Sequence, residues 1–208
     1  LDGDADRCVL VDDKGRIVNG DLILGIIATK WKNKNILKNN TVVGTNMTNS
    51  GLEKYFEKKD IKFIRSDVGD RNIINEMKKN GLVLGGEPSG HIILSNMSSS
   101  GDGLLASLEV LYTLKESKRK LSSFSNLFSP VPQIIENFSL KKNNSAEKIL
   151  KRLQSEIFKF NISLNSDSRL ILRKSGTENK IRVMIESKNK VIAKKIILKI
   201  KNILEDFN

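Results

Sequence analysis

The 208-residue sequence contains one cysteine, one histidine, one tryptophan and three prolines. Because Cys8 is the only cysteine, no disulfide can form within the chain, and this indicates a reducing, cytoplasmic setting. No apolar run reaches the roughly 18–20 residues that a membrane helix needs, so no membrane association is expected. The chain starts at Leu1 without a charged leader, and we interpret it as a piece of a longer protein rather than as a secreted precursor.

Acidic residues are fewer than basic ones: 24 Asp and Glu stand against 36 Lys and Arg, which gives a formal charge of +12. The basic residues are spread along the chain, and no zinc or helix-turn-helix pattern accompanies them. The charge therefore does not predict a nucleic-acid site. A basic surface also attracts phosphorylated small molecules, which are the partners that this composition favours.

Strand and helix patterns alternate in the first part of the chain, which predicts an α/β layer with a largely parallel sheet. A hairpin is expected around the turn at Lys14 and Gly15, and the apolar stretch 22–31 predicts a mostly buried helix. Asp102 is a candidate N-cap for a helix whose apolar positions are leucines. The other expected strands are 41–43, 62–66, 82–87 and 91–96, and the other expected helices are 51–60 and 71–80.

Residues 115–133, which include Pro130 and Pro132, form the stretch most typical of a linker. Beyond it, Ser145 is a candidate cap for a helix with Ile149, Leu150, Leu153 and Ile157 inward. Two strands with alternating apolar residues, 169–173 and 180–186, and a final amphipathic helix follow. These elements predict a second, smaller α+β module.

The opening stretch LDGDADR places Asp2, Asp4 and Asp6 at alternate positions, so an extended backbone turns all three carboxylates to one side. A calcium EF-hand loop is excluded, because Arg7 and Asp13 stand where that loop requires glycine and glutamate. Hard oxygen ligands beside a cation suit Mg²⁺, which keeps open positions for water or phosphate. A polar turn with solvated aspartates is the alternative.

The stretch GLVLGGEPSGHIIL predicts a tight polar loop between two apolar strands. Glu87 and Ser89, two positions apart, can both present oxygens to neighbouring hydroxyl groups, and His91 is the only histidine of the chain. An ordinary hairpin turn with an imidazole on the surface is the alternative.

The stretch RKSGTENKIRV combines a guanidinium, two hydroxyls and the backbone amides around a glycine. These groups can hold a phosphate dianion through charge-assisted hydrogen bonds. The residues are Arg173, Ser175, Gly176 and Thr177, and Arg182 could add a second charge from the following strand. A common turn without a ligand is the alternative.

In this order and at these separations, the three loops resemble those of the α-D-phosphohexomutase superfamily. DGDADR is similar to its metal loop, GEPSGH to its sugar-recognition loop and RKSGTEN to its phosphate-binding loop. The resemblance also includes VGDR (residues 68–71) and SGDG (residues 100–103). Among the branches, the chain most resembles the phosphoglucosamine mutases, and the phosphomannomutase/phosphoglucomutase branch is the alternative.

The resemblance implies an isomerase that interconverts glucosamine 6-phosphate and glucosamine 1-phosphate through a phosphoserine and a bisphosphorylated sugar, towards UDP-N-acetylglucosamine and peptidoglycan precursors. Asp2, Asp4 and Asp6 would hold Mg²⁺, and Arg7 would contact the phosphoryl group or assist proton transfer. Substrate binding would involve Glu87 and Ser89 at the sugar hydroxyls, with His91 as a candidate acid or base. The non-reacting phosphate would be held by Arg173, Ser175, Gly176, Thr177 and Arg182.

The resemblance also implies the domain organisation. Residues 1–38 would end domain 2, residues 39–124 would form a three-layer α/β domain 3, and residues 125–208 would form an α+β domain 4 with an antiparallel sheet. The phosphoserine loop of the family lies in upstream domains, so we expect the chain alone to be inactive, with its own missing N-terminal domains as partners and a homodimer as an open possibility.

Three positions depart from the family pattern. Lys174 and Asn179 replace prolines beside the phosphate loop, which predicts a less preorganised loop, and Pro88 replaces the usual residue of the sugar loop. A non-catalytic module that binds sugar phosphates is a further alternative.

Overall fold

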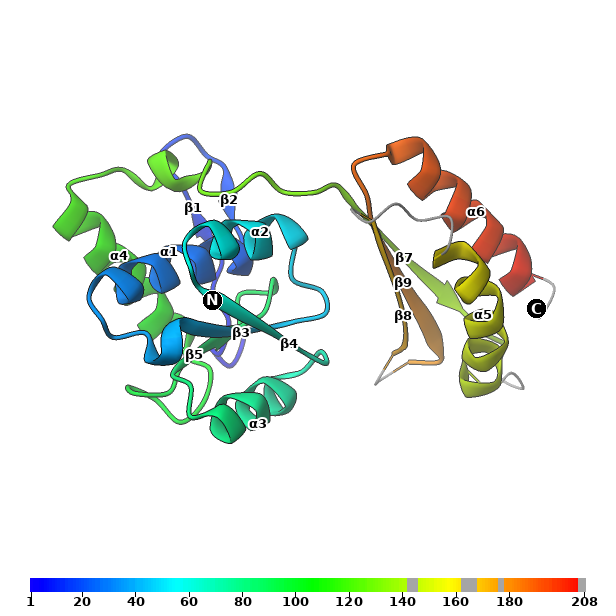
Figure 1. Cartoon of the computed structure of the whole chain (residues 1–208), viewed down its shortest axis with the longest axis horizontal. Helices are drawn as coiled ribbons and strands as arrows, with labels where there is room; N and C mark the ends of the chain where they lie inside the picture. Colours follow the sequence, from blue (N-terminus) through cyan, green and yellow to red (C-terminus); the bar gives the residue numbers. More distant parts are fainter. Residues whose placement is uncertain (142–145, 162–167, 176–177, 206–208) are drawn as a thin grey trace. The chain divides into compact units, whose positions relative to one another are not determined.

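The computed structural model describes residues 1–141, 146–161, 168–175 and 178–205, except for the side chains of residues 154 and 156–161. The chain divides into two compact units, Leu1–Pro130 and Val131–Asn208 (Figure 1). The division falls within the stretch 115–133 that the sequence indicates as a linker. Leu127 and Phe128, which follow the expected boundary at residue 124, pack against the core of the first unit. None of the helices in the described part of the chain is long and apolar enough to cross a membrane.

A four-stranded sheet forms the centre of the first unit, in the order β4-β3-β5-β6. β3 pairs in parallel with β4 and β5, and β6 runs antiparallel to β5, which confirms the prediction of a largely parallel sheet. The strands are β3 (Thr41–Thr45), β4 (Lys62–Ser66), β5 (Leu84–Gly86) and β6 (Ile92–Leu94).

Helices cover both faces of this sheet, which makes the unit a three-layer α/β structure (Figure 1). Because side chains alternate along a strand, Val42 packs into the core beneath three of the helices, whereas Val43 packs with Ile73 and Met77 of α3 on the opposite face. The three helices of the first face are α1 (Gly20–Asn33), α2 (Ser50–Lys58) and α4 (Gly103–Ser117), and α3 (Asp70–Asn80) covers the other face.

Polar side chains cap the helices at the positions that the sequence favours. The side chains of Asn19 and Asp102 accept hydrogen bonds from the backbone of Leu22 and Leu105, which starts α1 and α4. Gly81 ends α3 in the left-handed conformation with φ of 62°. The predicted cap at Asp102 is therefore confirmed.

The buried face of α4 is not the one that carries most of the leucines, as the sequence suggested. Leu104, Leu108 and Leu111 are 53–57% exposed, whereas Ala106 and Val110 are fully buried. The small residues let α4 approach β6 and α1 closely. Since this helix is apolar on nearly all sides, its periodicity could not identify which face is buried.

A short hairpin joins the opening loop, residues 1–7, to α1. β1 (Leu10–Val11) pairs antiparallel with β2 (Ile17–Val18) around a turn in which Gly15 has φ of 75°, as the sequence predicts. Asp13 at its tip accepts hydrogen bonds from the backbone and hydroxyl of Ser122, each 2.9 Å long. Ser122 belongs to the 3-10 helix η2 (Leu121–Phe124); a second 3-10 helix, η1 (Lys38–Asn40), precedes β3.

The second unit is a three-stranded antiparallel sheet in the order β7-β9-β8, with two helices packed on one face. Ile181, Val183 and Ile185 alternate along β9 towards Leu153 of α5 and Ile200 of α6. This confirms the smaller α+β module, although Ser145 and the side chain of Ile157 lie outside the described residues. The elements are β7 (Gln133–Ser139), α5 (Ala146–Asn161), β8 (Arg169–Lys174), β9 (Lys180–Glu186) and α6 (Lys190–Glu205).

Candidate active site

The opening loop gathers its three aspartates through a turn and not through the extended backbone that the sequence predicts: Ala5 has φ of 59°, and its N–H donates to the carbonyl of Asp2 at 3.3 Å. Asp2, Asp4 and Asp6 each offer one carboxylate oxygen, and these oxygens lie within 4.8 Å of one another. The loop is closed by the backbone N–H of Arg7, which donates to Oδ1 of Asp2 at 3.1 Å. Nε of Arg7 lies 3.4 Å from a carboxylate oxygen of Asp2 and 3.6 Å from one of Asp6.

The crowded carboxylates have unequal pKa values. Burial raises the pKa of Asp6; the charge of His91 opposes this effect, and the neighbouring carboxylates Asp2 and Asp4 reinforce it. Burial acts in the same direction on Asp2, but the hydrogen bond from the backbone N–H of Arg7, the contact with Asp6 and the charge of Arg7 together lower the pKa of Asp2. A cation among these groups would relieve the repulsion that Asp6 experiences.

The chemistry of this donor set fits Mg²⁺. All three donors are hard carboxylate oxygens, and Oδ1 of Asp6 is a buried atom that accepts no hydrogen bond from any described residue. Asp2 and Asp4 are exposed, which leaves the side of the loop open to water or a phosphate oxygen.

The loop that contains Glu87, Ser89 and His91 packs directly against the opening loop. Residues Arg7 and His91 form an isolated antiparallel bridge, and the N–H of Cys8 donates to the carbonyl of Gly90 at 3.1 Å. Gly90 has φ of 93°, and a Cβ atom at this position would lie 2.0 Å from the carbonyl oxygen of Cys8. Only glycine permits this approach, so the two loops form one backbone-bonded unit.

His91 is buried between these loops, with 6% of its surface exposed. Its Nδ1 lies 3.0 Å from Oδ2 of Asp6. The ring covers Gly101, where an added Cβ would lie 2.2 Å from Cε1 of the imidazole. A surface imidazole on an ordinary hairpin turn is therefore excluded, whereas the predicted acid or base role stays a prediction.

Glu87 and Ser89 lie side by side in the same loop. Oε1 of Glu87 accepts a hydrogen bond of 2.8 Å from the N–H of Gly69, and Oε2 accepts one of 3.1 Å from the hydroxyl of Ser89. The motif VGDR is part of the family resemblance, but the sequence alone assigned it no role. In the structure its Gly69 holds Glu87 in place. The motif SGDG also has a structural role, because it supplies Gly101, against which the ring of His91 packs.

The helices α1 and α4 both begin at this site. The N–H of Gly20 donates to the carbonyl of Pro88 at 3.1 Å, and that of Gly103 donates to the carbonyl of Ala5 at 2.9 Å. A Cβ at Gly20 would lie 1.9 Å from the carbonyl oxygen of Glu87. The first residues of α1 and α4 therefore anchor the two loops.

The predicted phosphate-binding residues lie in the second unit, and the structure brings two of them together. Arg173 of β8 stands opposite Arg182 of β9 in the sheet register. Ser175 follows β8 and is 1% exposed, and neither its hydroxyl nor the buried Nε of Arg182 makes a hydrogen bond to any described residue. Gly176 and Thr177 lie outside the described residues.

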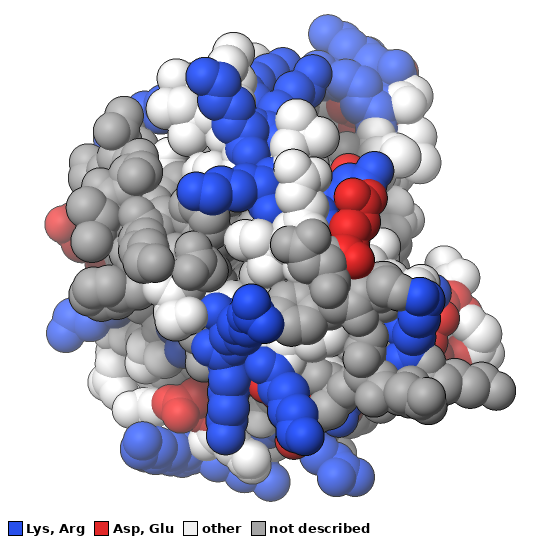
Figure 2. All heavy atoms as spheres, turned by 90° about the vertical axis from the view of Figure 1, so that its right-hand side faces the viewer, with Lys and Arg blue, Asp and Glu red and all other residues white. Residues whose placement is uncertain are grey.

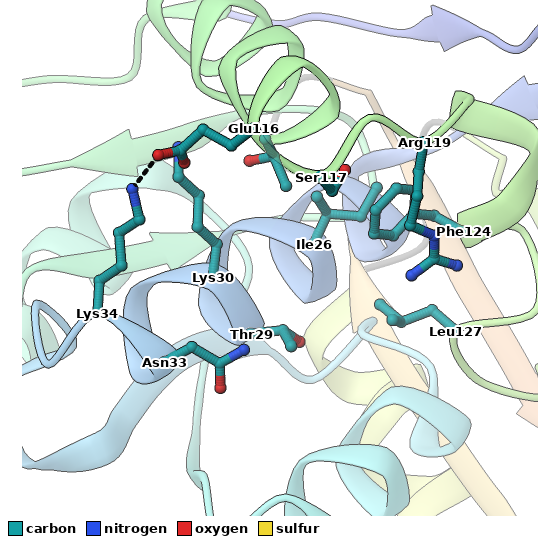
Figure 3. A pocket seen from close by; sticks show the side chains of 11 residues that line it. Ile26, Thr29, Lys30, Asn33, Lys34, Glu116, Ser117, Arg119, Phe124 and Leu127 are labelled. Carbon is teal, nitrogen blue, oxygen red and sulfur yellow. Dashed lines mark hydrogen bonds and ion pairs between the residues drawn. The ribbon is translucent and has the colours of Figure 1, made fainter.

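A cavity of about 370 Å³ lies at the opposite ends of α1 and α4 and contains none of the predicted site residues (Figure 3). Its charged side chains have partners within the protein: Lys34 pairs with Glu116, Lys30 lies 2.9 Å from Glu109, and Arg119 donates to Ser123. Ile26, Phe124 and Leu127 supply its apolar wall. The candidate active site is therefore not this cavity.

Comparison with known proteins agrees with the three loops. A family model described as phosphoglucomutase/phosphomannomutase, alpha/beta/alpha domain III, matches residues 19–131, and the model of the C-terminal domain of that family matches residues 137–203. Curated relatives called phosphoglucosamine mutase are 48% identical over 210 residues in Pelagibacter ubique and 44% identical over 197 residues in Zymomonas mobilis. These alignments cover 96% and 95% of this chain but 45% and 44% of the relatives, so the chain spans about half of their length.

A solved structure shares the fold. The N-acetylphosphoglucosamine mutase of Aspergillus fumigatus, in complex with GlcNAc-6P and magnesium, matches with a TM-score of 0.78 and 20% identity. The match covers 99% of this chain and 48% of the fungal chain.

Proposed function

Because the chain belongs to the phosphoglucomutase/phosphomannomutase family, we propose that it is the C-terminal part of a phosphoglucosamine mutase. The proposed reaction interconverts glucosamine 6-phosphate and glucosamine 1-phosphate through a bisphosphorylated sugar. The observation that supports it most is the joining of the aspartate loop and the sugar loop into one hydrogen-bonded unit through Arg7, Cys8, Gly90 and His91. Relatives that are 37–48% identical carry this name.

Asp2, Asp4 and Asp6 would hold Mg²⁺, which when bound neutralises charge on the transferring phosphoryl group. Arg7, whose side chain is 55% exposed, is proposed to contact that group. In phosphoryl transfer, positioning and electrostatics supply most of the catalysis, and here the rigid loop backbone supplies the positioning.

Sugar recognition is assigned to Glu87 and Ser89. Gly69 fixes one oxygen of the Glu87 carboxylate, and the other oxygen accepts from the Ser89 hydroxyl, so one sugar could contact both groups. A carboxylate accepts hydrogen bonds from sugar hydroxyls, and a serine hydroxyl can accept or donate. The pair could therefore bind the sugar in two orientations, as a reaction requires in which the bisphosphorylated sugar turns round.

The non-reacting phosphate is assigned to Arg173, Ser175, Gly176, Thr177 and Arg182. Two adjacent guanidinium groups and a buried hydroxyl that lacks a hydrogen bond among the described residues suit a dianion. The basic surface of the second unit would attract such a substrate: Lys and Arg are prominent on the face in Figure 2. The exposed lysines of α6 are Lys190, Lys194, Lys195, Lys199 and Lys201.

The phosphoserine would come from chain upstream of Leu1. We propose residues 1–38, 39–124 and 125–208 as the end of domain 2, domain 3 and domain 4, in a cytoplasmic protein that is inactive without its N-terminal domains. Sequencing the coding DNA upstream of Leu1 tests this organisation. An in-frame domain with a serine in a phosphorylatable loop supports the proposal, and a start signal directly before Leu1 contradicts it.

A comparison of substrates distinguishes the phosphoglucosamine mutase branch of the family from the phosphomannomutase/phosphoglucomutase branch. We expect kcat/KM of the full-length protein to be highest for glucosamine 6-phosphate among the phosphates of glucosamine, glucose and mannose. Preference for mannose or glucose phosphates would instead assign phosphomannomutase/phosphoglucomutase activity, which the description of the matching family model includes. Calorimetry on the 208-residue chain addresses the binding-module alternative, because tight sugar-phosphate binding by this chain without turnover in the full-length protein would favour it.

A further inference from the structure

We propose that the cavity at the C-terminal ends of α1 and α4 (Figure 3) is a second ligand site, which binds a small organic monoanion with an apolar ring. The cavity lies within the first unit and shares no residue with the aspartate loop, the sugar loop or the proposed phosphate site. Its occupation therefore does not depend on the mutase reaction.

The cavity has the size and the walls of a small-molecule site. Its volume of about 370 Å³ falls within the roughly 300–1,000 Å³ that is typical of ligand pockets. Ile26 of α1, Phe124 of η2 and Leu127 form an apolar wall, and the last turns of α1 and α4 supply polar side chains around it. A ring that covers this wall removes apolar surface from water, which favours binding.

The two lysines of the cavity are already neutralised by carboxylates. Nζ of Lys30 lies 2.9 Å from Glu109, and Lys34 is paired with Glu116 at one side of the cavity in Figure 3. Because each ammonium group faces a carboxylate, these four residues together carry no net charge.

Arg119 supplies a positive charge that no carboxylate of the described residues neutralises. Its Nε and Nη2 donate to the hydroxyl and the carbonyl of Ser123, both at 3.1 Å, and its guanidinium carbon lies 4.4 Å from the centre of the Phe124 ring. These contacts hold the guanidinium beside the apolar wall, while Nη1 makes no hydrogen bond to any described residue. A guanidinium in this position can pair with one carboxylate or sulfonate, so the cavity selects a monoanion whose ring packs against Ile26 and Leu127.

Two fluorescent probes with the same aromatic rings test the site on the 208-residue chain. The probe 8-anilinonaphthalene-1-sulfonate carries one negative charge, whereas N-phenyl-1-naphthylamine lacks the sulfonate. We expect Arg119→Gln to weaken binding of the sulfonate at least about tenfold and to leave binding of the amine within about threefold. Lys118→Gln removes the same charge at the neighbouring position, which does not line the cavity, and should bind both probes like the unmodified chain.

A second pair of variants separates the cavity from the exposed apolar face of α4. Ser117 lines the cavity, so the ring introduced by Ser117→Phe should occupy the space of the ligand and weaken binding of both probes at least about tenfold. Leu108 is 53% exposed and lies outside the cavity. Leu108→Ser should therefore leave the affinity for both probes unchanged.

A further measurement needs no variant. With the sulfonate bound to the unmodified chain, nuclear Overhauser effects should connect its ring protons to the methyl groups of Ile26 and Leu127. Saturating glucose 6-phosphate should leave these signals unchanged. If the substituted chains do not fold, as judged by circular dichroism, this measurement alone decides.

Several results would overturn the proposal. They are the absence of sulfonate binding, equal sulfonate affinity in Arg119→Gln and Lys118→Gln, or full binding of both probes by Ser117→Phe. Overhauser effects to Leu104, Leu108 and Leu111 instead of Ile26 and Leu127 would place the probe on the exposed face of α4. Displacement of the sulfonate by glucose 6-phosphate would place it at the proposed phosphate site.

Discussion

Arg173 and Arg182 stand opposite each other in the register of the β8–β9 pair, so two like charges lie on neighbouring strands. Opposed like charges destabilise an antiparallel pair by up to about 1 kcal/mol. The neighbouring hydroxyl of Ser175 is buried and makes no hydrogen bond to the described residues. The anion site proposed for these residues would offset the repulsion between the two charges.

Arg182→Gln should therefore raise the free energy of unfolding at low ionic strength and remove the stabilisation that phosphate provides. Thermal unfolding with and without glucose 6-phosphate measures both effects. Lys194→Gln removes the same charge from the exposed face of α6 and should keep the response to the sugar phosphate. A variant of Arg182 that is still stabilised by the ligand would contradict the assignment.

Gly90→Ala should destabilise the first unit by about 3 kcal/mol, because the added methyl group meets the carbonyl of Cys8 and a positive φ disfavours alanine. Urea denaturation measures this loss. Gly3→Ala, in the same region with no atom within 4 Å of the new methyl group, should change stability little. Equal stability of the two variants would show that the loops do not pack as described.

Cys8 should resist thiol reagents in the native chain. It is 2% exposed, and burial raises the pKa of its thiol, which lowers the fraction of reactive thiolate. We expect slow reaction with Ellman's reagent at pH 8 and rapid reaction after denaturation in guanidinium. If the thiol of the native chain reacted about as fast as that of the denatured chain, loop 87–91 would not cover Cys8.

The contact between Asp13 and Ser122 should stabilise the hairpin in a pH-dependent manner. The backbone hydrogen bond from Ser122 lowers the pKa of Asp13, and the hydroxyl of Ser122 lowers it further. Because the folded state holds the charged form, this stabilisation is present above the ordinary pKa of about 4 and is lost as the pH falls through the lowered pKa. Asp13→Asn should therefore lower Tm at pH 7, whereas the two proteins should converge towards pH 3.

The sequence predicted the helices and turns that depend on residues close together along the chain. Asp102 starts α4 because its side chain accepts from the backbone of Leu105, and Gly15 permits the hairpin turn. Alternation of apolar residues likewise anticipated β9, since one face of its sheet is buried by helices. The three aspartates of the opening loop do lie together, but a turn at Ala5 gathers them and not the extended backbone that the spacing argument assumed.

Other features depend on contacts between distant segments, which a local pattern does not contain. The exposed face of α4 follows from how closely Ala106 lets the helix approach its neighbours. Burial of His91 follows from Gly101, ten positions later along the chain, and the position of Glu87 follows from Gly69. The glycines of VGDR and SGDG were the available signal, because close backbone approach often requires glycine.

Conversion of glucosamine 6-phosphate by the full-length protein tests the central claim most directly. With Mg²⁺ and a trace of the bisphosphorylated sugar, ³¹P NMR should show the resonance of the C6 phosphate decrease while that of a C1 phosphate appears. The account predicts this exchange, and predicts that Asp6→Asn in the same protein abolishes it. A glucosamine 6-phosphate resonance that stays unchanged, in a folded protein that carries the upstream serine, would contradict the account.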